Sequence, residues 1–86
     1  MARYRLLFKK SVAKDLRAIP KKDISRILKS IEALAEEPRP DGSEKLTDQN
    51  RYRIRQGQYR IIYEIQDDAL VIVVVKVGHR EGVYRH

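Results

Sequence analysis

The sequence predicts an α+β domain in which a two-helix hairpin packs against a mainly antiparallel four-stranded sheet. Two observations carry this prediction. In the first half of the chain the apolar residues recur every three or four positions, which is typical of one face of a helix. After residue 43 they alternate with polar residues, which is typical of strands. The expected order is β-α-α-β-β-β, and 86 residues suit one hydrophobic core, so we expect residues 1–86 to form a single domain.

The first half predicts one short strand and both helices. Residues 3–8 form a strand candidate, and the apolar residues of 9–19 then fall at helical spacing. Pro20 ends this helix, because the residue before a proline avoids the helical conformation. The clearest helix is 22–36, with apolar residues on one face and charged residues on the other. Two prolines and an Asp-Gly-Ser sequence within 38–43 predict a loop after it.

The second half predicts three strands joined by tight turns. Residues 51–55 alternate arginine with tyrosine and isoleucine, Gly57 supplies the positive φ of a hairpin turn, and residues 59–65 form the return strand. After a turn at 66–68, the β-branched residues of 69–77 suit a strand that is buried on both faces. The sequence leaves open whether the first strand pairs with these strands in parallel or antiparallel orientation.

Residues 51–60 (RYRIRQGQYR) collect four arginines and no acidic residue. Because like charges on neighbouring strands destabilise a sheet, we expect a cluster with no acids nearby to bind an anion. The alternative is a set of solvated arginines whose stems cover apolar neighbours. Alternation places an apolar set under the helices, namely Tyr52, Ile54, Tyr59, Ile61, Tyr63 and Ile65. The opposite face should carry Arg51, Arg53, Arg55, Arg60, Ile62 and Glu64.

The composition narrows the classes of function. The chain carries 19 Lys and Arg against 12 Asp and Glu, and this net charge of +7 favours a nucleic acid or an acidic protein as partner. Its longest apolar run, residues 69–75, is far shorter than the roughly 20 residues that cross a bilayer. With no cysteine and no signal peptide, we expect a soluble cytoplasmic protein with no membrane contact. His79 and His86 lack neighbouring ligands, so we expect no metal and no cofactor.

Two motifs in the second half of the chain form a signature. The first, YRIRxGxYRIIY, spans residues 52–63 and follows Lys45-Leu46; the second, VGHRxxVY, spans residues 77–84. Together with the element order, these motifs resemble the RelE/ParE superfamily of toxins from type II toxin–antitoxin systems, and in particular its RelE-like branch. The resemblance extends over nearly the whole chain.

The resemblance implies a metal-independent mRNA interferase, an endoribonuclease that inhibits translation by cutting messenger RNA, in many members within the A site of the 70S ribosome. A ribose 2′-OH attacks the adjacent phosphorus and the 5′-oxygen leaves. A small, acidic, RelB-like antitoxin keeps such a toxin silent. The expected catalytic residues are Arg53, Arg55, Arg60, His79, Arg80 and Tyr84, and the expected RNA contacts are Lys45, Arg51 and Arg85.

One departure from the family pattern concerns the general base. The best-known members carry lysines at the strand positions of Arg53 and Arg55, and an arginine keeps its proton too firmly to serve as a base. Histidine titrates near neutral pH, so His79 is the expected substitute, with Tyr84 as a stacking or proton-transfer residue. Structural roles for both, at the strand end and as a packing anchor, are the alternatives.

Two rival functions stay open at this point. ParE-like relatives share the fold and poison DNA gyrase by binding, without cutting RNA. A chain that has lost its activity and only binds its antitoxin is the other alternative, and the arginines in place of lysines are compatible with it.

Overall fold

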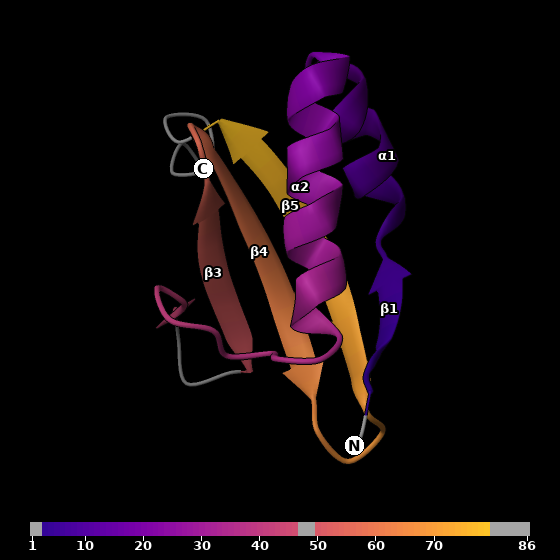
Figure 1. The fold of residues 1–86 in the computed structure, drawn as a ribbon. Coiled ribbons are helices and arrows are strands. Elements are labelled where there is room, and N and C mark those ends of the chain that lie inside the picture. The colour runs from indigo at the N-terminus through magenta and orange to yellow at the C-terminus, as the bar shows by residue number, and fades with distance from the viewer. Residues whose placement is uncertain (1–2, 47–49, 80–86) are drawn as a thin grey trace.

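The computed structural model describes residues 3–46 and 50–79, and within these ranges the chain forms two helices and five strands. Figure 1 shows α1 and α2 together on one face of a single sheet. In chain order the elements are β1 (Arg5–Phe8), α1 (Lys10–Arg17), α2 (Lys21–Leu34), β2 (Glu44–Lys45), β3 (Arg51–Gln56), β4 (Tyr59–Gln66) and β5 (Val71–His79).

The strands follow the order β1-β5-β4-β3-β2, so the first strand of the chain lies beside the last (Figure 1). β1 pairs with β5 in parallel, and the other three pairs are antiparallel. The predicted α+β class is therefore confirmed, and the orientation that the sequence left open is parallel. β2 is a fifth strand beyond the four expected. Two residues are too few to show a period, which is why the alternation pattern does not reveal it.

The expected helices and strands are present, with their ends displaced by a few residues. The helix expected at 9–19 spans Lys10–Arg17, and the one expected at 22–36 spans Lys21–Leu34. Gly57 has the expected positive φ, 61°. The last strand runs over 71–79 rather than 69–77, because Leu70 takes a φ of 54° and still belongs to the turn. Neither helix in the described part of the chain is long and apolar enough to cross a membrane.

The core lies between the helices and the sheet. α1 and α2 bury Val12, Ile27, Ile31 and Leu34 against it. The strands contribute Ile54, Ile61, Tyr63, Ile65, Ile72, Val74 and Val77. Four of the six side chains that alternation places under the helices are thus buried, while Tyr52 and Tyr59 pack partly against the same cluster. The face assignment is confirmed for this side of the sheet.

Leu70 occupies a backbone conformation that leucine disfavours, and its replacement by glycine should stabilise the protein. A non-glycine residue in the left-handed region is strained by roughly 1–2 kcal/mol. Leu70 is 40% exposed, so little packing is lost. Because glycine also loses more backbone entropy on folding, we expect Leu70→Gly to raise the free energy of unfolding by up to about 1 kcal/mol. Urea unfolding measures the change.

A matched control for this substitution is Leu7→Gly. Leu7 is similarly exposed, at 44%, but lies in β1. A glycine inside a strand weakens it, so this control should be less stable than the wild type. A loss of stability in Leu70→Gly as large as that in Leu7→Gly contradicts the prediction.

Candidate functional site

The arginines of β3 and β4 gather on the sheet face that turns away from the helices. The register pairs Arg55 with Arg60, Arg53 with Ile62 and Arg51 with Glu64. Directly opposed residues of antiparallel strands share a face, with Cβ atoms about 5 Å apart. The structure therefore brings Arg53, Arg55 and Arg60 together, as alternation predicts. We call these three residues the arginine face.

Burial differs sharply within the arginine face. Arg55 is exposed, whereas Arg53 and Arg60 are each only 7% exposed. The alternative of a simply solvated arginine is therefore wrong for Arg53, and Arg60 is buried as well. A buried guanidinium is expensive unless other groups compensate for the lost water, so the surroundings of these two side chains define the electrostatics of the site.

The expectation that no acids lie nearby is wrong. Glu44 of β2 pairs with Arg53, and Glu64 of β4 pairs with Arg51 at 2.9 Å. Both carboxylates reach the arginines from neighbouring strands, which the alternation of residues 51–60 alone does not reveal. Among the residues that the structure describes, Arg55 makes no ion pair, although it stands directly opposite Arg60. Arg55 and Arg60 thus bring two cations side by side, and one anion could accept hydrogen bonds from both.

His79 lies at the end of β5 and on the other side of the sheet. It pairs with Tyr59, whose ring meets the imidazole edge-on with the centroids 5.8 Å apart. Its Nε2 shares a hydrogen bond of 3.0 Å with Gln58. Tyr59 packs towards α2 and donates a 3.4 Å hydrogen bond to Asp23. By their strand positions, His79 and Arg60 therefore lie on opposite sides of the sheet. The catalytic role of His79 stays a prediction.

The remaining predicted site residues are spread around this centre. Lys45 is exposed on β2 and pairs with Tyr52, which places it on the helix side of the sheet edge. Arg51 lies on the same side as the arginine face and is held by Glu64. Arg80, Tyr84 and Arg85 lie outside the described residues. Sequence analysis missed Glu44, and the only signal for it was its place directly before Lys45, in a loop with no visible strand pattern.

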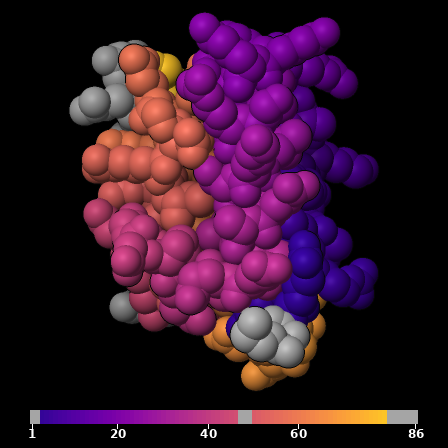
Figure 2. Space-filling view, in the orientation of Figure 1, coloured from indigo at the N-terminus to yellow at the C-terminus, as the bar shows by residue number. Residues whose placement is uncertain are grey.

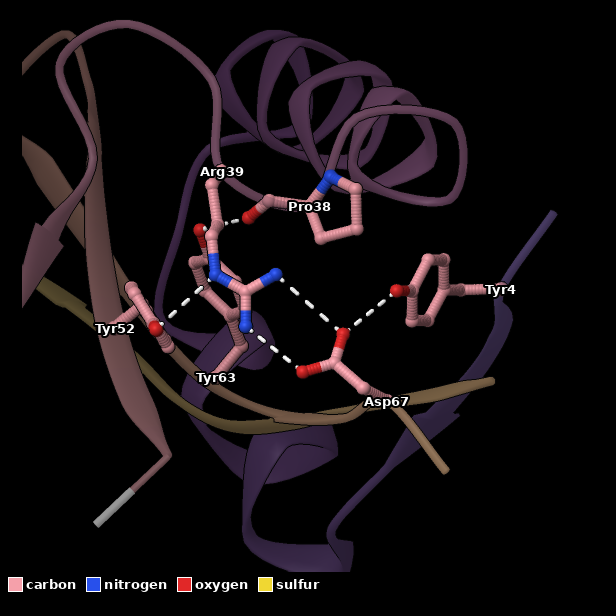
Figure 3. A network of polar contacts seen from close by, with 6 residues as sticks. All are labelled: Tyr4, Pro38, Arg39, Tyr52, Tyr63 and Asp67. Carbon is pink, nitrogen blue, oxygen red and sulfur yellow. Dashed lines mark hydrogen bonds and ion pairs between the residues drawn. The ribbon is translucent and has the colours of Figure 1, made fainter. Parts of the chain in front are cut away.

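A polar network holds the loop that leads from α2 into β2 (Figure 3). Arg39 lies over the ring of Tyr52, 5.2 Å from its centroid, and its Nε donates to the Tyr52 hydroxyl at 3.1 Å. Its Nη2 donates to Asp67 at 2.9 Å, and the Tyr4 hydroxyl donates to the same carboxylate at 2.7 Å. Four segments that are distant in sequence thus meet at the end of the sheet where β4 turns into β5.

A third tyrosine, Tyr63, holds the same loop through a hydrogen bond to its backbone. Tyr63 is fully buried, stacks on Tyr52 with centroids 6.0 Å apart, and donates a 2.7 Å hydrogen bond to the carbonyl oxygen of Pro38. Burial raises the pKa of Tyr63 to about 12, so the hydroxyl keeps its proton. The loop that carries Glu44 to the arginine face is therefore anchored by contacts that do not themselves belong to that face.

Asp67→Asn should weaken this network in a pH-dependent way. Hydrogen bonds from Arg39 and Tyr4 lower the pKa of Asp67 in the folded protein. A lowered folded pKa contributes stability above the unfolded value, about 3.9, and this contribution is lost as pH falls through the folded pKa. We expect the variant to melt below the wild type at pH 7, and the gap to close below about pH 4. Asp68→Asn, in the same turn, is the control; a gap independent of pH contradicts the prediction.

Comparisons with known proteins agree with this geometry. The profile of the ParE toxin of the type II toxin–antitoxin system parDE matches residues 6–84. The RelE1 protein of Methanocaldococcus jannaschii is 30% identical over an alignment of 86 positions, which covers 90% of this chain and 90% of that protein. A chain of the RelE–RelB complex from Pyrococcus horikoshii superposes with a TM-score of 0.82 at 34% identity, covering 100% of both chains.

A chain of the toxin–antitoxin complex RelBE2 from Mycobacterium tuberculosis also has a TM-score of 0.82, with 25% identity over 93% of this chain and 94% of that one. The matches span almost the full length of this chain and of its relatives. The protein therefore belongs to the RelE/ParE superfamily of toxins of type II toxin–antitoxin systems, and within it is RelE-like.

Proposed function

We propose that this toxin is a metal-independent endoribonuclease that cuts messenger RNA in the A site of the ribosome. The observation that carries the proposal is the arginine face, where Arg55 and Arg60 stand directly opposite each other on adjacent strands. A phosphodiester is an anion whose oxygens match the planar fork of arginine with two parallel hydrogen bonds. The net charge of +7 adds attraction for RNA at longer range.

The proposed reaction is attack of a ribose 2′-OH on the adjacent phosphorus. Negative charge grows on the phosphoryl oxygens as the new bond forms. Fixed cations that point at these oxygens stabilise the transition state more than the ground state, and such preorganised charges are usually the largest catalytic term. Arg55 is exposed and Arg60 is buried, so the pair combines access with a side chain whose freedom is restricted by burial.

We propose further that a small acidic RelB-like antitoxin neutralises the toxin. The structures from Pyrococcus horikoshii and Mycobacterium tuberculosis hold toxins together with antitoxins, which supports such a partner for this chain. Exposed apolar side chains on β1 and α2, namely Leu7, Phe8 and Leu28, offer contacts for a chain that folds on binding. The positive charge of the toxin favours an acidic partner.

Primer extension on mRNA from cells that express the toxin tests the proposal. We expect new 5′ ends at defined positions within translated frames, and the same ends when purified toxin acts on mRNA bound to purified ribosomes. Cleavage of free mRNA at the same rate contradicts the ribosome dependence but not the nuclease activity. Intact mRNA together with blocked DNA supercoiling supports the alternative, gyrase inhibition by a ParE-like toxin.

A further inference from the structure

We infer that Glu44 is the general base of the proposed reaction and that Arg53 positions it. This inference rests on the proposed function, because it assigns a proton acceptor to that same reaction. The 2′-OH must lose its proton as it attacks, and a guanidinium has no lone pair to accept it. A carboxylate has such lone pairs, so the acidic residues beside the arginine face are the first candidates.

Glu44 has both a fixed position and access to solvent. Its strand register places it directly opposite Arg53, on the arginine face, and its carboxylate accepts a hydrogen bond from Arg53 Nη2. The Arg53 side chain is only 8% exposed, whereas that of Glu44 is 63% exposed. A buried arginine thus holds one oxygen of an accessible carboxylate, which leaves the other oxygen for a substrate.

The space beside Glu44 suits a substrate group. A hollow of about 510 Å³ is lined by Glu44, Arg53 and Arg55, together with Ser30 of α2 and Gly42 of the preceding loop. Its volume falls within the range of small-molecule sites, roughly 300–1,000 Å³. Among the described residues, β2 pairs only with Tyr52 and Arg53, so no described strand pairs with the outer edge of β3 beyond Arg53 (Figure 1).

Figure 2 shows the helix side of the molecule, with α2 across the front and the β3–β4 hairpin projecting beside it. The hollow lies at the edge of the sheet, because its lining includes Glu44, Arg53 and Arg55 from the side of the arginine face and Ser30 and Ile54 from the helix side. The network around Arg39 anchors that loop, and so the position of Glu44 depends on contacts outside the site.

The other candidates meet fewer of these requirements. Glu64 lies on the same side of the sheet but is held by Arg51 at 2.9 Å, and its side chain is only 26% exposed. His79 starts on the opposite side, beside Tyr59. Among the residues that the structure describes, Glu44 alone joins exposure, contact with the arginine face and a neighbouring hollow.

The proposed step is a transphosphorylation to the ribose 2′-oxygen. The Glu44 carboxylate takes the 2′-OH proton, the O2′–P bond forms, and the P–O5′ bond breaks. The departing O5′ takes up a proton from solvent. The products are a 2′,3′-cyclic phosphate and a 5′-hydroxyl end, and Glu44 returns its proton to water.

The test is the pH profile of single-turnover cleavage of a short synthetic mRNA bound to ribosomes, for the wild type, Glu44→Gln and Glu44→Asp. We expect Glu44→Gln to slow cleavage by about 10²–10⁴-fold at pH 7. Its residual rate should rise about tenfold per pH unit, because hydroxide then replaces the missing base. The wild-type rate should be nearly flat over the same range, and Glu44→Asp should restore part of the rate together with the flat profile.

The control is Glu36→Gln, which removes an exposed carboxylate that pairs with Arg3 and does not line the hollow. It should cleave at the wild-type rate. A Glu44→Gln variant that is folded by circular dichroism and equally active overturns the inference, and so does a slower variant with an unchanged pH profile, since that result marks Glu44 as structural. Failure of the wild type to cut any mRNA instead overturns the proposed function, and the inference with it.

Discussion

Replacing Arg55 with alanine is expected to slow RNA cleavage about 100-fold or more and to leave the fold intact. The guanidinium of Arg55 is exposed and stands opposite Arg60, where two cations can hold one phosphoryl group. Losing one of these two cations removes stabilisation that exists mainly in the transition state. Because Arg55 makes no ion pair among the described residues, its truncation should change the melting temperature little. Single-turnover cleavage and thermal unfolding measure the two effects.

The matched control is Arg5→Ala. Arg5 is also an exposed strand arginine, but it lies in β1, at the opposite edge of the sheet from β3. It should cleave at the wild-type rate. The salt dependence of RNA affinity separates binding from chemistry. About four phosphate contacts give a slope near −3 when the logarithm of the association constant for single-stranded RNA is plotted against the logarithm of salt concentration. Arg55→Ala should reduce the size of this slope by about 0.7. A folded Arg55→Ala variant with the wild-type rate contradicts the assigned site.

Among the substitutions considered, Ile61→Ala is expected to lower the free energy of unfolding most. Ile61 is fully buried, pairs with Ile54 and Val77, and follows Arg60 in β4. Replacing a buried isoleucine with alanine removes about 2–5 kcal/mol from the free energy of unfolding. Native domains have only about 5–15 kcal/mol in total, and a short chain lies towards the lower end, so Ile61→Ala should be close to unfolding at 37 °C.

Urea unfolding at 25 °C measures this loss, with Leu28→Ala as the control. Leu28 is an apolar residue of α2 that is 37% exposed, so its truncation removes less buried surface and should be clearly milder. Equal losses for the two variants contradict the core assignment. Ile61→Ala also tests the link from packing to function, because the strand that carries Ile61 on one face carries Arg60 on the other.

The parts of the fold that follow a local period could be predicted from the sequence. The apolar stripe of α2 and the alternation along β3 and β4 are written in neighbouring residues, and both face assignments follow from them. β5 begins later than expected because Leu70 adopts a left-handed conformation, and no pattern in the sequence marks that conformation. A register shift between β4 and β5 near Ile62 and Tyr63 is equally invisible to alternation.

The candidate site was only half predictable for a related reason. The arginines lie on one continuous hairpin, so their common face follows from period and turn alone. The ion pair of Glu44 with Arg53 joins the hairpin to a two-residue strand, β2. The register of β2 depends on the position of the preceding loop, which the Arg39 network holds. Such non-local pairing cannot be inferred from local composition. The same limit applies to His79, whose side of the sheet follows from its partner Tyr59.

Cleavage of two synthetic mRNAs that differ only in the sugar at the cut nucleotide tests the central claim most directly. Primer extension first locates the cut, and a single 2′-deoxy substitution is then placed on its 5′ side. We expect the all-ribose mRNA to be cut on the ribosome to a 2′,3′-cyclic phosphate and the substituted mRNA to stay intact, because the attacking 2′-OH is missing. Cleavage of both mRNAs at equal rates contradicts 2′-OH attack, and with it the roles assigned to the arginine face and Glu44.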